Sequence, residues 1–381
     1  MIQPLTHAPH HHFFGYYGIS PWNRTQRHHL TLATNFDDRA VEVGDKAVVG
    51  LVDMVAQTVR PLAETAAFNL QQGSMLHWIQ VGQAEEFTYN DWEGDQLVTR
   101  AVDPQTGQRR TLCAAIAAVS PTEPVAIGLN FARMRLCRRV VGYANAHYSP
   151  ANIIAQPEDD GLFLIDLRTG EARLLLSIAE VARHLSVDGA AGQPHWFNHV
   201  IFNTDGTRLI FFCRIQQPGR RFLDSVWTVN SDGTELACQI PYGYTASHLA
   251  WMDPQRLMIS TDVLGQMQFV TFRDRHGDFT PYGGGHFPSD GHNAFSPNFR
   301  FIACDARLAS PRHGYILLLY DIQRNAMHTL GEFEHPPHVQ GDWRCDLHPR
   351  WSPDGRLISF DSVHEGTRQI YMADVTALVG M

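Results

Sequence analysis

One short phrase occurs four times in the chain, and this repeat constrains the fold more than any other feature. Each copy opens with a histidine, has an aromatic residue three positions later, and continues through a tight turn into an apolar strand that ends on a charged residue. The opening residues are His199, His248, His292 and His348, and the charged ends are Arg214, Asp262, Asp305 and Asp361. Each end follows its histidine by 13 to 15 residues. A hairpin returns to the level where it began, so each histidine and its charged residue are expected to share one edge.

The repeat predicts an all-β, seven-bladed β-propeller. A further strand lies some 20 residues after each opening position, and units of about 40–50 residues with four strands are propeller blades. Three more degenerate copies fit upstream, so the blades are expected to begin near residues 13, 74, 114, 197, 247, 291 and 347. The last copy stops after its third strand, which predicts that the N-terminal segment closes the ring as a fourth strand. Residues 1–381 are expected to form a single domain.

Composition narrows the class of protein. The chain has 381 residues, 44% of them apolar, which suits a well-cored globular fold. A formal net charge of −9 argues against nonspecific binding to nucleic acid or to a membrane surface. The six cysteines are scattered without a Cys-x-x-Cys pair, so no disulfide framework is expected. The first residues lack the regions of a signal peptide and no segment could span a bilayer, which predicts a cytoplasmic protein, or a secreted one if the chain was trimmed.

One stretch departs from the repeat. Residues 178–197 begin with a pattern typical of a short amphipathic helix and lead into His195. Such an insertion either walls a pocket or serves as a long connector, and the sequence favours neither.

The densest cluster of metal-binding residue types opens the last blade. Cys345 and His348 lie there, and His292 and Asp305 open and close the blade before. Because neighbouring blades converge on the propeller axis, these four side chains are expected to lie within metal-ligand distance. One thiol, two imidazoles and a carboxylate suit Zn²⁺ better than Mn²⁺. The alternative is a structural network of hydrogen bonds between blades.

A second cluster carries acid–base and anion-binding chemistry. His195 and His199 flank one strand and Arg214 ends its partner, which suits a general base and a carboxylate clamp. The alternative is a core histidine beside an ordinary ion pair. Residues on irregular segments or at the equivalent repeat position are further candidates to line the same site: Arg133, Arg135, Tyr143, Tyr148 and His248. The sequence contains no nucleophile elbow, phosphate loop, dinucleotide fingerprint or His-Glu-x-x-His motif.

Three phrases resemble a known family over nearly the whole chain. They are Phe13-Phe-Gly-Tyr-Tyr-Gly-Ile-Ser-Pro-Trp-Asn, His195-Trp-Phe-Asn-His and Cys345-Asp-Leu-His-Pro-Arg-Trp-Ser-Pro-Asp-Gly. All three look like the seven-bladed propeller polysaccharide lyases, which include oligogalacturonate lyases and propeller ulvan lyases. The resemblance implies a metal near the channel mouth and cleavage of uronate-containing glycans by β-elimination.

The resemblance carries over residue by residue, though unevenly. His292 and His348 match metal-ligand positions of the oligogalacturonate type. Asp346 stands where that type has the first histidine of a His-Pro-His-Pro segment, whereas Cys345 looks more like the ulvan type. His199 and Arg214 match the region that supplies the base and the arginine facing the carboxylate.

The implied reaction fits these residue types. Arg214, with or without a cation, is expected to neutralise the uronate carboxylate. His195 or His199 is expected to remove the C5 proton, and Tyr143 or a histidine to protonate the departing oxygen. The expected partner is an anionic uronate-containing oligosaccharide or polysaccharide, and the metal is either catalytic or a structural clamp. The alternatives are a non-catalytic propeller that binds a glycan or protein on the same face, and a hydrolase, for which no carboxylate pair or serine nucleophile can be placed.

Overall fold

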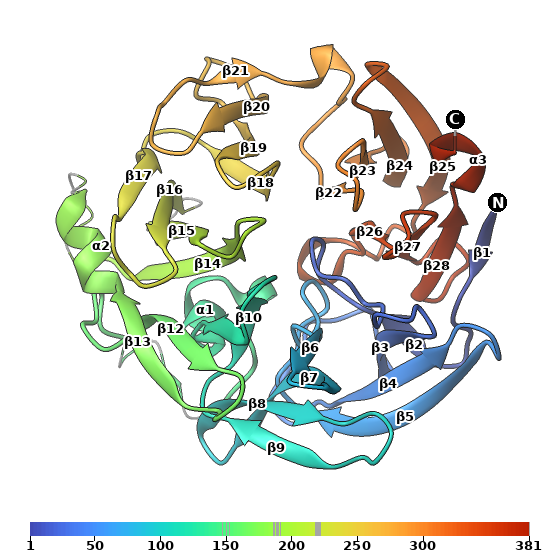
Figure 1. Cartoon of the computed structure of the whole chain (residues 1–381), viewed down its shortest axis with the longest axis horizontal. Helices are drawn as coiled ribbons and strands as arrows, with labels where there is room; N and C mark the ends of the chain where they lie inside the picture. Colours follow the sequence, from blue (N-terminus) through green and yellow to red (C-terminus); the bar gives the residue numbers. More distant parts are fainter. Residues whose placement is uncertain are drawn as a thin grey trace. The chain divides into compact units, whose positions relative to one another are not determined.

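The computed structural model describes residues 1–380 except 147, 150, 152, 186, 188, 189, 191 and 218–221. Over this part of the chain, the strands form seven four-stranded sheets, so the fold is a seven-bladed β-propeller, as predicted (Figure 1). The chain divides into two compact units: unit 1 holds Met1–Trp78 and everything from Gly283 onward, and unit 2 holds Ile79–Tyr282. The prediction of a single domain stays a prediction.

Unit 1 contains three complete antiparallel sheets, each numbered below from the inner strand outward. The first is β2 (His11–Phe13), β3 (His28–Thr34), β4 (Ala47–Asp53) and β5 (Thr58–Thr65). The second is β22 (Asn293–Phe295), β23 (Phe301–Arg307), β24 (Gly314–Asp321) and β25 (Ala326–Glu334). The third is β26 (Arg350–Trp351), β27 (Leu357–Ser362), β28 (Gln369–Asp374) and β1 (Ile2–Pro4).

The other four sheets belong to unit 2, except that the first two residues of β6 lie in unit 1. They are β6 (His77–Val81), β7 (Ala84–Glu93), β8 (Gln96–Val102) and β9 (Arg109–Leu112); β10 (Ile116–Val119), β11 (Val125–Gly128), β12 (Gly161–Asp166) and β13 (Ala172–Ser177); β14 (His195–Phe202), β15 (Arg208–Ile215), β16 (Leu223–Asn230) and β17 (Ala237–Ile240); and β18 (Ala246–Trp251), β19 (Arg256–Thr261), β20 (Gln268–Arg273) and β21 (Thr280–Pro281).

The repeat phase and the closing strand are both confirmed. The inner strands begin within a few residues of the predicted positions. In unit 1, β1 pairs antiparallel with β28, with Ile2 opposite Ala373 and Pro4 opposite Tyr371 (Figure 1 shows β1 beside β28). The chain therefore supplies the fourth strand of its last blade from its other end, so β28 is paired along both sides.

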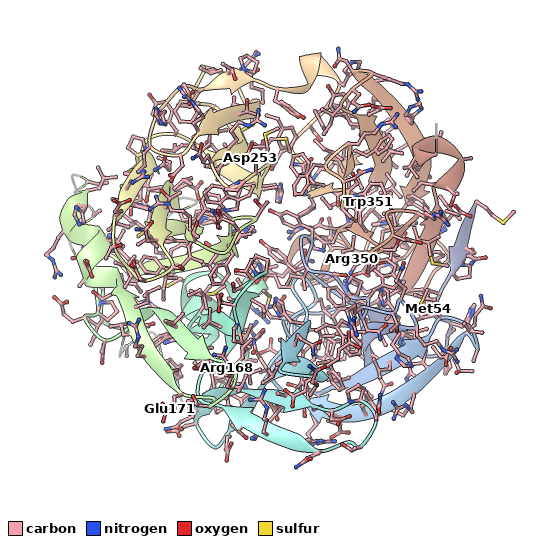
Figure 2. All side chains as sticks on the ribbon, in the orientation of Figure 1. Met54, Arg168, Glu171, Asp253, Arg350 and Trp351 are labelled. Atoms are coloured by element: carbon pink, nitrogen blue, oxygen red, sulfur yellow. The ribbon has the colours of Figure 1, made fainter. Side chains whose placement is uncertain are left out.

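The aromatic position of the repeat ties neighbouring blades together within each unit. In unit 1 the indole N–H of Trp351 donates to the carbonyl of Ala294 at 2.8 Å, and in unit 2 Trp251 donates to Ile201 at 3.4 Å. Figure 2 shows Trp351 next to Arg350 on β26. Each indole buries a large apolar surface and satisfies its one donor on the preceding blade, which explains why an aromatic residue recurs at this point of the phrase.

The turn of the phrase also repeats one hydrogen bond. The side-chain oxygens of Ser296 and Ser352 accept from backbone N–H groups five residues later, at 2.9 Å in both cases. Asn203 does the same in unit 2 at 3.0 Å. Side chains that bond to their own turn in this way favour tight turns over continued strand, so the Ser-Pro and Asn-Thr clusters set the hairpin register.

Short helices complete the structure. They are α1 (Phe131–Cys137), α2 (Ile178–His184) and α3 (Thr376–Val379), with single 3₁₀ turns η1 (Arg139–Val141), η3 (Gly283–Gly285) and η4 (Gly341–Trp343). The predicted helix after residue 177 is thus confirmed as α2, and Ser177 caps it by accepting from the N–H of Glu180. Across the described residues, no helix has the length and apolar character needed to cross a membrane.

Candidate functional site

The β22–β23 hairpin of unit 1 brings His292 and Asp305 together, as the repeat predicted. Asp305 accepts from the backbone N–H of His292 at 2.8 Å, and both of its oxygens lie 3.0 Å from Nδ1 of that ring. A carboxylate can only accept, so Nδ1 carries the proton that faces it. Burial acts to lower the pKa of His292, but the charge and hydrogen bond of Asp305, together with the charges of Asp346 and Asp290, outweigh burial and raise it. Asp305 therefore fixes this imidazole with Nε2 pointing away from the carboxylate.

His348 meets His292 from the neighbouring blade. Its Nε2 lies 3.1 Å from Nε2 of His292, and its backbone N–H donates to Asp305 at 3.1 Å. Its φ is +46°, in the left-handed region that non-glycine residues seldom adopt. Burial, followed by the charge of His292, lowers the pKa of His348 well below its usual value, so this imidazole is neutral. A strained backbone held at this point by a buried carboxylate is typical of functional sites.

Asp346 is the third member of the group. It is buried, and it receives hydrogen bonds from the Tyr315 hydroxyl and from Nε of Arg344, whose Nε lies 2.8 Å from Oδ2. Burial opposes its ionisation, but the charges of Arg344 and His292 and the hydrogen bond from Tyr315 favour the ionised form and lower the pKa, so the group is a carboxylate. Ligand atoms of His292, Asp346 and His348 all lie within 4.8 Å of one another, the only such group of three in the described part of the chain.

These three residues fit a divalent metal ion. Two imidazole nitrogens bound at 2.0–2.1 Å to one ion are separated by about 2.8–3.4 Å for octahedral to tetrahedral angles. The observed separation of 3.1 Å between the two Nε2 atoms lies in that range. The carboxylate behind His292 is the usual outer partner of a metal-binding histidine. The donor set is two nitrogens and an oxygen, which zinc and manganese both accept.

Two tyrosines from the first blade cover the imidazole pair. The Tyr17 ring stacks on His348 with centroids 6.2 Å apart and meets His292 edge-on at 4.9 Å, and Tyr16 lies 5.9 Å from His348. Gly15 lets the chain enter this position: its φ is +108°, and a Cβ there would lie 2.5 Å from the backbone of Gln72. The Tyr-Tyr part of the first family-like phrase is therefore a wall of the site.

Two of the four predicted metal ligands, Asp305 and Cys345, lie outside this group of three. Asp305 contacts the backbone N–H and Nδ1 of His292. Cys345 is fully buried with Val339 and Val363, and burial raises the pKa of its thiol to about 12, which disfavours the thiolate that a metal requires. Cys345 thus packs in an apolar cluster, whereas Asp346 and His348 lie with His292.

In unit 2, Arg214 forms a buried ion pair with Asp224. Its Nε donates to Asp224 at 2.6 Å and its Nη1 to Asn198 at 3.1 Å, and its guanidinium packs on Phe212 and Phe222. Only 3% of the residue is exposed. The partner Asp224 lies opposite Arg214 on β16, a strand that the two-strand phrase did not include. Arg214 thus has the ion pair that the sequence left open as the alternative to a carboxylate clamp.

The two histidines of the predicted base lie on β14. His195 is buried and donates Nδ1–H to the carbonyl of Gln193 at 2.8 Å, and burial lowers its pKa, so it is neutral with Nε2 as an acceptor. His199 is half-buried at a bulge with φ +56°, and its ring meets Phe212 edge-on. His199 and His348 thus both have a left-handed backbone at the opening of a blade. Of the two histidines on β14, His199 is more exposed than His195.

The side chains of Tyr143 and Arg133 are buried in the interior of unit 2. Tyr143 is fully buried, stacks on Phe131 at 4.4 Å and accepts from Asn90, and burial raises its pKa. A phenol enclosed in this way cannot reach a substrate, which corrects its assignment as proton donor. Arg133 is buried and donates to three backbone carbonyls, those of His195, Ile154 and Ala155, which accounts for most of its donors.

The remaining predicted residues are dispersed through unit 2. Tyr148 is 42% exposed and lines a cavity of about 460 Å³ with Arg133. Arg135 lies partly exposed on α1, with Nη1 donating to the carbonyl of Arg139. His248 is half-buried beside Ser247 on β18. The wall of that cavity contains no residue of α2.

Sequence reasoning missed Tyr315 and the convergence of Asp346 with the two histidines. The available signal for Asp346 was its position two residues before His348. Tyr315 lies 31 residues from Asp346 and belongs to another blade, so no local pattern marks it.

Comparison with known proteins supports the fold. No family model and no curated protein matches the chain. Among solved structures, an oligogalacturonate lyase from Vibrio parahaemolyticus is 17% identical with a TM-score of 0.66, covering 98% of this chain and 93% of its own. An oligogalacturonate lyase in complex with manganese gives the same identity and TM-score over 100% of this chain and 94% of its own. A puromycin-hydrolysing peptidase from Mycobacterium tuberculosis is 11% identical with a TM-score of 0.56, covering 95% of this chain but only 52% of its own.

Proposed function

We propose that this protein is a metal-dependent lyase that cleaves uronate-containing oligosaccharides by β-elimination. The observation that carries the proposal is the convergence of His292, Asp346 and His348, with Asp305 fixing the first of them from behind. The similarity in fold to two oligogalacturonate lyases, one of them in complex with manganese, supports the choice of reaction and of substrate class.

The site would hold a divalent cation through one carboxylate oxygen and two imidazole nitrogens. A bound cation would supply positive charge for the uronate carboxylate, whose charge grows as the neighbouring C5 proton leaves. Manganese is the first ion to test. The expected preference for zinc rested on a thiolate ligand, and Cys345 packs in an apolar cluster instead.

The chain's own residues would prepare the site before substrate arrives. Asp305 holds one proton on Nδ1 of His292, which keeps Nε2 available as a ligand. Arg344 and the Tyr315 hydroxyl keep Asp346 ionised in a buried position. Tyr16 and Tyr17 hold the two imidazoles in place and limit the access of water.

The base that the sequence predicted, His199 or His195, lies on β14 in unit 2 and stays a prediction. His199 is the more exposed of the two and is the first candidate to test. His195 keeps a neutral ring with an acceptor nitrogen and is the second candidate.

The test measures metal binding and elimination on the same preparations. The wild-type protein is treated with chelator, reloaded with Mn²⁺ or Zn²⁺, and mixed with oligogalacturonate, ulvan-type and other glucuronate oligosaccharides, while the absorbance of unsaturated uronate is followed. We expect product with at least one substrate, dependent on metal. His348→Ala and Asp346→Asn should lose both metal and activity, whereas Cys345→Ser should keep both.

The alternative function is a non-catalytic propeller that binds a glycan or a protein, and the same experiment distinguishes it from a lyase. A folded, metal-loaded protein that binds a uronate oligosaccharide but forms no unsaturated product from any of the panel would establish it. Retention of metal by His348→Ala would refute the ligand assignment whatever the activity.

A further inference from the structure

We propose that Arg307, backed by Arg344, binds an anionic group on the sugar next to the one that is cleaved. The inference rests on the proposed function, because it describes substrate recognition at the same site. Arg307 lies at the end of β23, two residues after Asp305. Side chains two apart in a strand share one face, so Arg307 lies on the face from which Asp305 contacts His292.

The cross-strand neighbour of Arg307 links it to the candidate metal ligands. Arg307 lies opposite Tyr315 in the β23–β24 register, and its guanidinium carbon lies 5.8 Å from the centre of that ring. The Tyr315 hydroxyl donates to Asp346, and Arg344 pairs with the same carboxylate. Two guanidinium groups thus flank one phenol that touches the site.

Arg307 differs from Arg344 in having no acidic partner. It is exposed, and within the described residues no carboxylate lies within ion-pair distance of it. Arg344 already donates hydrogen bonds from Nε to Asp346 and from Nη1 to the carbonyl of Gly341. In a chain with a net charge of −9, an unpaired arginine beside a cluster that includes two buried carboxylates is available for an anion from outside.

The charges of the loaded site favour such an anion. A divalent ion with Asp305 and Asp346 is neutral in sum, and Arg344 and Arg307 add two positive charges. The carboxylate of the reacting uronate would balance one of them, which leaves Arg307 for a second anion. A guanidinium binds carboxylate and sulfate oxygens in the same two-pronged geometry, so either a second uronate or a sulfated sugar has the required chemistry.

The experiment compares substrates that differ only in the charge of the neighbouring sugar. The full-length, Mn²⁺-loaded protein is assayed with an oligouronate bearing free carboxylates, with the same compound methyl-esterified on the neighbouring sugar, and with a uronate flanked by a sulfated sugar. For the substrate whose neighbouring anion Arg307 binds, we expect Arg307→Gln to raise KM about 10- to 100-fold with kcat nearly unchanged. KM for the methyl ester should not move, and Arg307→Lys should recover part of the loss.

Arg356→Gln is the matched control. Arg356 is also exposed in unit 1, but it lies at the turn between β26 and β27, at the other end of the hairpin from His348. It should leave KM unchanged for every substrate. An Arg307→Gln protein with unchanged KM for both the free acid and the sulfated substrate would overturn the inference.

The inference can fail separately from the proposed function. If the wild-type protein eliminates uronate and Arg307→Gln makes no difference, only the inference is lost. If no substrate is eliminated, calorimetric binding of the same three compounds still decides the role of Arg307. A wild-type preference for the free acid or the sulfated compound that disappears in Arg307→Gln supports it, and the absence of such a preference refutes it.

Discussion

Asp305→Asn tests the site at the point where the structure makes its most specific statement. Asp305 is only 1% exposed and accepts from the backbone N–H groups of His292 and His348 and from Nδ1 of His292. Asparagine has nearly the same shape, but it lacks the charge, and one of its two terminal groups is a donor. Because both carboxylate oxygens of Asp305 face N–H groups, the amide NH₂ must meet a donor whichever way it is turned.

The expected loss follows from these contacts. Removing the charge and one charge-assisted hydrogen bond costs about 1.5–3 kcal/mol, which is about 10- to 100-fold in affinity for the metal. The loss should appear as a higher Kd for Mn²⁺, measured by titration calorimetry on chelator-treated, full-length protein. The fold should persist, because the backbone donors of the hairpin keep one acceptor.

Asp321→Asn is the control for burying an amide in place of an acid. Asp321 is equally buried, ends β24 of the same blade, and pairs with Arg300 at 3.3 Å instead of with a histidine. Its variant should bind Mn²⁺ as the wild type does, even if it is less stable. If Asp305→Asn kept its affinity within about threefold while Asp346→Asn lost it, the carboxylate behind His292 would be only a backbone brace, and our reasoning would be refuted.

Three further predictions concern other parts of the chain. Arg214→Met should destabilise the protein by about 3–5 kcal/mol, because it leaves Asp224 buried without its cation. Arg214→Met combined with Asp224→Leu should restore the denaturation midpoint. If the double variant also had elimination activity, Arg214 would have no part in catalysis. Burial lowers the pKa of His77 to about 4, so the folded state takes up its proton only well below the usual value of 6.5, and stability should fall as pH drops from 6.5 towards 4. At pH 5 this amounts to about 2 kcal/mol, and His77→Phe should reduce the pH dependence of the free energy of unfolding, measured by urea denaturation, by that amount. Gly15→Ala should lower both the melting temperature and the affinity for Mn²⁺, since a Cβ at φ +108° meets the backbone of Gln72 and displaces Tyr16 and Tyr17; unchanged Mn²⁺ binding in this variant would show that the tyrosine wall does not hold the imidazoles.

The sequence by itself determined the seven blades, their phase and the closing strand. These follow from alternating apolar strands and from turn residues that bond to their own backbone, both of which are local properties. The pairing of His292 with Asp305 was predictable for the same reason, because one hairpin contains both.

Tertiary structure decided which side chains form the site. Asp346 lies with His292 and His348, whereas the thiol of Cys345 packs with Val339 and Val363, and Tyr315 reaches Asp346 from another blade. Arg214 pairs with Asp224 from the strand beyond its own hairpin. The direction of a side chain near a blade opening depends on single φ values, such as those of His199 and His348, and these are held by contacts from distant segments rather than by local sequence.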